Sequence, residues 1–304
     1  MSERTAIGKP DGAEIERLLD AVHRLELAAR SHAAGRALGD YRTTIRGRGM
    51  DFHEVRPYVP GEPVRNIEWN ITARLGAPFV KVHREERERE VVIALDVSPS
   101  MRSGFQDRTK LEYAVELAAT LAVEARDSGD RLGHVIFTDR TLDHARPRGG
   151  RGQLFRTLRS FLEHAEPLQD AVAESDPRAA IHTIESWRRH RLVIFLISDF
   201  IDHDLPDDLK YARAHHDLSL LHVYDPLEYA GAGSPARVFA FSPEGQERPA
   251  RSLRPGDAGN LDEIQDFLRR KCSRLRIAFA SCSTAEPVDQ VLRDFFHRKR
   301  HAGR

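Results

Sequence analysis

Oxygen-bearing side chains follow two of the most apolar segments of this 304-residue chain. Asp96, Ser98 and Ser100 come directly after one apolar run, and Asp199 closes a second one. A carboxylate and hydroxyls at alternating positions of a tight loop point the same way, which gathers their oxygen atoms on one side. Mg²⁺ prefers such hard oxygen ligands, with one or two carboxylates and several waters. The two loops therefore predict a site for a divalent cation, Mg²⁺ or Mn²⁺.

The same residue types also have a purely structural use, because Asp and Ser side chains cap helices and stabilise turns through local hydrogen bonds. Capping explains either loop taken alone. It does not require Asp-x-Ser-x-Ser after one apolar segment and Ser-Asp after another in the same chain. We therefore favour the metal site, with Asp96, Ser98, Ser100 and Asp199 as its candidate ligands.

The sequence carries no signature of a hydrolase or of a nucleotide-binding enzyme. It lacks HExxH, GxSxG and the P-loop motif, and neither Ser98 nor Ser100 has a sequence-linked His that would act as its base. The Gly-Gly-Arg-Gly segment at residues 149–152 is interpreted as a turn. A nucleophilic Asp96 that accepts a phosphoryl group is an alternative, although Ser98 stands where such phosphatases bring a second carboxylate. We expect recognition rather than catalysis, and therefore not an enzyme.

These loops must be positioned by the elements around them. From residue 91 onward, apolar segments alternate with amphipathic ones, which is typical of a mostly parallel sheet covered by helices on both faces. The predicted fold class is α/β, a doubly wound mostly parallel sheet, in which ligand sites lie at the carboxyl ends of the strands. The expected strands span residues 91–97, 132–138, 192–198, 218–224 and 275–280, with an edge strand at 141–146 and a polar hairpin at 237–241 and 248–252. The expected helices span residues 110–127, 153–164, 178–189, 207–216, 261–274 and 287–298.

The first 90 residues have a different texture. Segment 1–44 holds an amphipathic pattern that predicts an N-terminal helix. Glycine and proline interrupt residues 45–90, which predicts a small turn-rich β module ahead of the α/β domain at residues 91–304. Trp69 is expected to be the buried anchor of that module. The alternative, a nucleic-acid face with aromatic interleaving, would use Trp69 with the neighbouring residues Arg56, Arg65, Asn70 and Arg74.

Composition argues against several classes of partner. Lys and Arg number 47, as do Asp and Glu, so the formal net charge is zero and no overall field attracts nucleic acid or an anionic membrane. No apolar run approaches the roughly 20 residues that a membrane-spanning helix needs, and the first ten residues hold no signal-peptide core. We expect a cytoplasmic protein with no membrane span and no nucleic-acid partner.

The Asp96-x-Ser98-x-Ser100 loop together with Asp199 resembles the metal-ion-dependent adhesion site of von Willebrand factor A-like domains. In those domains a Thr from a further loop supplies another hydroxyl to the metal. The corresponding place in this chain is Ser175, which keeps the hydroxyl. The resemblance thus implies a metal held by Ser98, Ser100 and Ser175, with charge from Asp96 and Asp199 directly or through water. It leaves one position open for an Asp or Glu carboxylate of a partner protein.

A longer segment resembles the bacterial domain-of-unknown-function-58 family, in which such a domain follows a signature sequence. Residues 47–74 are similar to that signature, including Arg-Pro-Tyr-Val-Pro-Gly-Glu-Pro-Val-Arg at 56–65, and Asp-Pro-Leu-Glu at 225–228 also fits. The resemblance implies pairing with a MoxR-type AAA+ ATPase in a chaperone-like or assembly role. Two alternatives stay open: a Mg²⁺-dependent phosphohydrolase that uses the same oxygen cluster, and a structural module with a vestigial metal site.

Overall fold

The structure, a computed structural model, describes residues 12–34, 41, 54–60, 64, 67, 69–82, 88–104, 108–165, 175–187, 191–200, 205, 208–229 and 261–302. The chain divides into two compact units. One comprises Met1–Thr44 with Arg89–Arg304, and the other comprises Ile45–Glu88. The polar hairpin expected at 237–241 and 248–252 lies outside the described residues.

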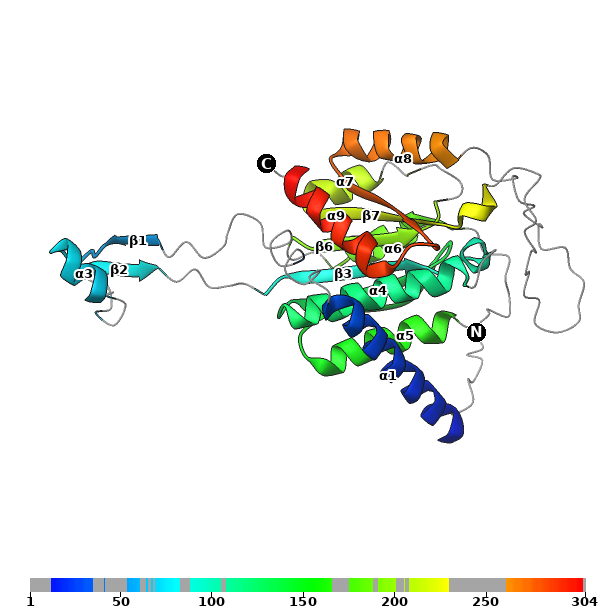
Figure 1. Cartoon of the computed structure of the whole chain (residues 1–304), viewed down its shortest axis with the longest axis horizontal. Helices are drawn as coiled ribbons and strands as arrows, with labels where there is room; N and C mark the ends of the chain where they lie inside the picture. Colours follow the sequence, from blue (N-terminus) through cyan, green and yellow to red (C-terminus); the bar gives the residue numbers. More distant parts are fainter. Residues whose placement is uncertain are drawn as a thin grey trace, which may run out of the picture. The chain divides into compact units, whose positions relative to one another are not determined.

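The larger unit is built on a six-stranded sheet (Figure 1) with the strand order β5-β4-β3-β6-β7-β8. Every neighbouring pair is parallel except β4 and β5, which form an antiparallel edge. Chain order thus runs outward in both directions from the centre, which confirms the predicted doubly wound, mostly parallel sheet. The strands are β3 (Glu90–Asp96), β4 (Arg131–Phe137), β5 (Thr141–Arg148), β6 (Val193–Ser198), β7 (Asp217–Tyr224) and β8 (Ala278–Ser283).

Helices cover both faces of this sheet (Figure 1). One face carries α4 (Lys110–Asp127), α5 (Arg151–Ala165) and α9 (Val288–Ala302). The N-terminal helix α1 (Gly12–Ala34) packs on the outside of α4 and α5. The opposite face carries α6 (Pro177–Glu185), α7 (Asp208–His215) and α8 (Leu261–Leu275). Two one-turn 3₁₀ helices complete the unit, η2 (Pro99–Arg102) and η3 (Pro226–Glu228). No described helix is both long and apolar enough to cross a membrane.

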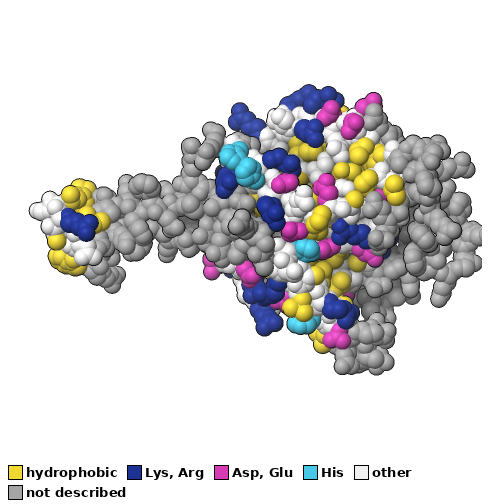
Figure 2. Space-filling view, viewed as in Figure 1, with side chains coloured by type: hydrophobic (Ala, Val, Ile, Leu, Met, Phe, Trp, Pro, Cys, Tyr) yellow, Lys and Arg dark blue, Asp and Glu magenta, His cyan; other side chains and the backbone are white. Residues whose placement is uncertain are grey.

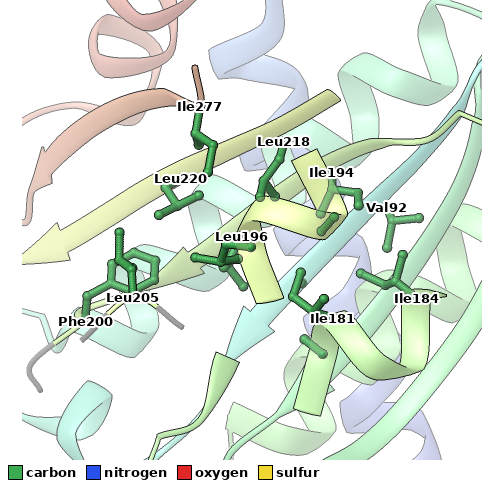
Figure 3. Close-up of a cluster of buried hydrophobic side chains, with 14 of the residues drawn as sticks. Val92, Ile181, Ile184, Ile194, Leu196, Phe200, Leu205, Leu218, Leu220 and Ile277 are labelled. Atoms are coloured by element: carbon green, nitrogen blue, oxygen red, sulfur yellow. The ribbon is translucent and has the colours of Figure 1, made fainter. Parts of the chain in front are cut away.

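The central strands are apolar because both of their faces are covered. In β3 every residue after Glu90 is buried, and all six residues of β6 are buried. Figure 3 shows one side of this core, in which Ile194 and Leu196 of β6 lie among side chains of β7 and α6. This packing holds β3 and β6 in place, and with them the carboxyl ends of the two strands, where the two predicted ligand loops begin.

One expected strand was misplaced by three residues, since residues 275–280 were expected and β8 spans Ala278–Ser283. The apolar run at 275–280 was assigned to a strand, but α8 continues to Leu275 and β8 begins only at Ala278. Arg276 has a φ of 55°, and the backbone N–H of Ile277 donates to the carbonyl of Cys272 at 2.8 Å. These are the features of a left-handed helix terminus, here on a residue other than glycine, which the sequence pattern does not reveal.

The smaller unit pairs β1 (Glu54–Pro57) with β2 (Phe79–Val82) in antiparallel fashion, with α3 (Trp69–Leu75) between them in the chain. Among its described residues, Val80 is the buried one. The expectation that Trp69 is a buried anchor was wrong, because its side chain is 63% exposed. Two four-residue strands and a seven-residue helix do not enclose an indole ring.

Candidate metal centre

The predicted ligands lie at the carboxyl edge of the sheet, on either side of its centre. Asp96 is the last residue of β3, and Asp199 directly follows the last residue of β6. These two strands are neighbours, yet the chain runs from β3 to β4 on one side and from β6 to β7 on the other. Open α/β sheets bind ligands at such a switch point, because the two connections diverge and leave a crevice there.

Asp96 is the hub of the hydrogen-bond network at this edge. Its Oδ1 accepts from the backbone N–H of Ser98 at 2.8 Å. Its Oδ2 accepts from the hydroxyls of Ser175 and Ser198, both at 2.6 Å. The carboxylate is fully buried, so three separate segments of the chain meet on one side chain.

The hydroxyls of Ser98 and Ser100 form the second part of the cluster. Their Oγ atoms lie 3.1 Å apart, in the turn that leads into η2. Ser98 occupies the N-cap position of η2, but its side chain makes no capping hydrogen bond. Its hydroxyl is therefore turned to Ser100 and not used to stabilise the helix end, which weakens the capping alternative for this residue.

Ser175 reaches the cluster from a different loop. It stands directly before Asp176, which caps α6 by accepting from the backbone N–H of Arg178 at 3.0 Å. The cap and Pro177 at the first helical position fix the start of α6. The structure thus places the Ser175 hydroxyl on Asp96, 79 positions away in sequence.

Asp199 is held from the other side by a buried lysine. Lys110, the first residue of α4, donates from Nζ to Asp199 Oδ2 at 2.9 Å and to Glu228 Oε1 at 2.8 Å. Burial alone would lower the pKa of Lys110, but the charges of Asp199 and Glu228 outweigh it and raise the pKa above its ordinary value. Lys110 is therefore a fixed cation beside the candidate metal ligands.

The electrostatics of the cluster favour a positive ion. Burial, and then the nearby charge of Asp199, raise the pKa of Asp96 to about 6, against the opposing effect of the hydrogen bonds from Ser175, Ser198 and the Ser98 amide. The negative charge of the buried Asp96 carboxylate is therefore unfavourable unless a further cation lies nearby. A divalent cation would supply that positive charge, so the donor set fits one.

The donor chemistry points to a hard cation. The cluster offers carboxylate and hydroxyl oxygen, and no group of three or more His, Cys, Asp or Glu side chains gathers as a metal site anywhere in the part of the chain that the structure describes. Hydroxyl and carboxylate oxygen suit Mg²⁺ and Mn²⁺ better than softer transition metals.

Sequence reasoning missed Ser198, Lys110 and Glu228. Ser198 directly precedes the predicted ligand Asp199, so its position in the sequence could have identified it. Its hydroxyl also accepts from the backbone N–H of Phe200 at 3.1 Å. The position of Lys110 gave a weak hint in the sequence. A cation at a helix N-terminus interacts unfavourably with the helix dipole, so a lysine there suggests a nearby negative charge that compensates it. Glu228 lies 118 residues from Lys110, and no spacing rule connects the two.

Comparison with known proteins identifies the family. Residues 54–231 match the family described as "Protein of unknown function DUF58". The uncharacterized proteins Mb1516 of Mycobacterium bovis and Rv1480 of Mycobacterium tuberculosis are each 30% identical to this chain over 213 residues, which are 70% of this chain and 67% of each relative.

The solved structures that align with this chain include BatB, a conserved hypothetical protein of Bacteroides thetaiotaomicron. It aligns with a TM-score of 0.47 and 17% identity, over 69% of this chain and 98% of that one. An aerotolerance-related membrane protein of Bacteroides fragilis aligns with a TM-score of 0.44 and 18% identity, over 69% and 99%. The family match spans more than half of the sequence, and this chain therefore belongs to the DUF58 family of bacterial proteins.

Proposed function

We propose that this chain is a metal-dependent protein-interaction module. Ser98, Ser100 and Ser175 would hold Mg²⁺ or Mn²⁺, and Asp96 and Asp199 would supply negative charge directly or through water. When bound, the ion supplies a Lewis-acidic position that an Asp or Glu carboxylate of a partner protein completes. The observation that supports this most is the convergence of three separate segments of the chain on the buried Asp96 carboxylate.

The same cluster is poorly equipped for catalysis. Hydrolysis of a phosphoester needs a nucleophile or a general base beside the metal. Lys110 is committed to two carboxylates, and the Asp96 carboxylate already accepts three hydrogen bonds. The proposal is therefore recognition, with no enzymatic activity.

The resemblance to the DUF58 family suggests the partner, a MoxR-type AAA+ ATPase, met in the bacterial cytoplasm during a chaperone-like or assembly task. A nucleic-acid partner is not proposed. On the face shown in Figure 2, Lys and Arg side chains are interspersed with Asp and Glu, and they form no continuous basic patch there.

The proposal is tested by a pull-down of the ATPase with the full chain in Mg²⁺, in EDTA, and with Ser98→Ala in Mg²⁺. We expect capture by the wild type in Mg²⁺ alone, because both other conditions remove the metal position. Ser186→Ala is the matched control, since this serine lies exposed at the end of α6 and its hydroxyl donates to the Thr183 carbonyl of the same helix. Equal capture in all conditions would support the vestigial site, and Mg²⁺-dependent turnover of p-nitrophenyl phosphate would support the phosphohydrolase.

A further inference from the structure

The candidate metal centre contains a buried lysine that two carboxylates share. Lys110 Nζ lies 2.9 Å from Asp199 Oδ2, and 2.8 Å and 3.0 Å from the two carboxylate oxygens of Glu228. The three side chains are 1%, 2% and 2% exposed. Burying charges is costly unless they are paired and hydrogen-bonded. The three side chains therefore depend on one another for their charged state.

Glu228 is also joined to the loop that carries the candidate ligands. The Ser103 Oγ lies 2.5 Å from Glu228 Oε1 and 2.8 Å from the carbonyl oxygen of Ser100. The backbone N–H of Lys110 donates to the Ser103 carbonyl at 2.9 Å. Glu228 lies in η3, after β7. It therefore contacts Ser103 and Lys110, which neighbour the candidate ligands, although it is not itself a proposed ligand.

The charges of these groups nearly match one divalent ion. With their carboxylates ionised, Asp96, Asp199 and Glu228 together with Lys110 carry a formal charge of −2. Removing Lys110 would deepen that negative charge, and removing the charge of Glu228 would halve it. Since charges in a water-poor environment interact over many ångströms, each change acts on a cation bound among the loops.

We propose that Lys110 and Glu228 set the affinity of this site for divalent cations. Lys110 is the internal counter-ion of Asp199 and weakens the attraction of that carboxylate for a second cation. Glu228 shares the lysine and so leaves Asp199 part of its charge. Lys110 and Glu228 are thus positioning residues that act on the metal through Asp199, and this inference rests on the proposed metal site.

The experiment is a calorimetric titration of MgCl₂ into the full chain, with unfolding of the metal-free protein followed in parallel. Glu228→Gln should weaken Mg²⁺ binding about tenfold or more, and Lys110→Met should strengthen it by a similar factor. The double variant Lys110→Met/Glu228→Gln restores the wild-type charge and should bind within about threefold of the wild type. Opposite shifts from two neighbours are not produced by a merely structural loss, which weakens binding in both cases.

Lys299 provides a matched control. It is a partly buried lysine, with its side chain 12% exposed and its Nζ 3.2 Å from Asp217 Oδ2. Asp217 begins β7, at the end of the strand opposite to η3. Lys299→Met should destabilise the fold while leaving Mg²⁺ affinity unchanged.

The outcomes separate this inference from the proposed function. A wild type that binds no Mg²⁺ removes the metal site and this inference together. A wild type that binds, with Glu228→Gln unchanged or tighter, keeps the metal site and overturns the role of the pair. If Lys110→Met fails to fold, Glu228→Gln and the double variant decide the question. In Glu228→Gln, Asp199 keeps its lysine, and in the double variant Asp199 is the single carboxylate of the triad left without one.

Discussion

Asp96 combines a structural and an electrostatic role on one side chain. It ties the Ser98 amide, Ser175 and Ser198 together, and its burial beside Asp199 makes its negative charge unfavourable. The same residue therefore holds the loops together and, through its unfavourable charge, would favour a cation at the proposed site. This explains why the hydroxyls alone would not define the site.

The raised pKa of Asp96 predicts an unusual pH dependence in EDTA. The folded state holds the protonated carboxyl up to a pH of about 6, whereas the unfolded chain releases the proton near the ordinary pKa, so the metal-free fold loses stability as the pH rises through this window. Asp96→Asn, which stays neutral, should exceed the wild type by about 1–3 kcal/mol at pH 8, and the gap should shrink at pH 5.

Urea unfolding at both pH values measures this difference. With excess Mg²⁺ the gap should close or reverse, because only the wild type retains the carboxylate. A variant less stable than the wild type at pH 8 in EDTA would show that the Asp96 charge is compensated within the protein.

At the scale of elements, residues whose role follows from chain order were predictable from sequence. Asp96 ends β3, Ser98 and Ser100 lie in the loop after it, and Asp199 directly follows β6. Parallel strands bring their carboxyl ends to one edge. Lys110 and Glu228 were not predictable, because their meeting depends on how α4 and η3 pack around that edge.

Ser175 shows the middle case. Its hydroxyl reaches Asp96 only because the cap of α6 places the preceding residue at the carboxyl edge. Family resemblance singled it out, whereas the sequence around it did not, because no strand was predicted to end there. The prediction for Trp69 was wrong for a different reason. Its aromatic type suggested burial, but its side chain is 63% exposed among the described residues of the smaller unit.

The exposure of Trp69 leads to a prediction about the smaller unit. Trp69→Ala should change the free energy of unfolding by no more than about 0.5 kcal/mol, as for other exposed positions. Its fluorescence in a Trp187→Phe background should be readily quenched by acrylamide. Loss of about 3 kcal/mol or more, the usual effect of truncating a buried Trp, would mean that the indole is covered in solution.

At the scale of the whole larger unit, N-terminal residues are integrated into the sheet domain. Tyr41 is 1% exposed, packs edge-on against Phe296 of α9 with ring centroids 5.3 Å apart, and donates to Asp130 at 3.1 Å. Val22 and Ala29 of α1 are buried as well. Helix α1 and Tyr41 therefore contribute to the core around α4 and α9.

Tyr41→Ala should accordingly destabilise the fold by about 3–5 kcal/mol, the range for large buried aromatic residues. The control is Tyr211→Ala on α7, where the side chain is 67% exposed and the cost should stay within about 0.5 kcal/mol. Chemical denaturation of both variants measures this, and equal stabilities would show that the N-terminal segment is not part of the core.

The central claim, that the loops after β3 and β6 bind a divalent cation, is tested most directly by calorimetric titration of Mg²⁺ into the full chain. The wild type should bind one ion, and at a free concentration of ten times Kd this should stabilise the fold by about 1.4 kcal/mol. Ser98→Ala and Asp96→Ala should each weaken binding about tenfold or more, because each removes an oxygen from the cluster. No detectable binding by the wild type, or binding by both variants with the affinity of the wild type, would contradict the account.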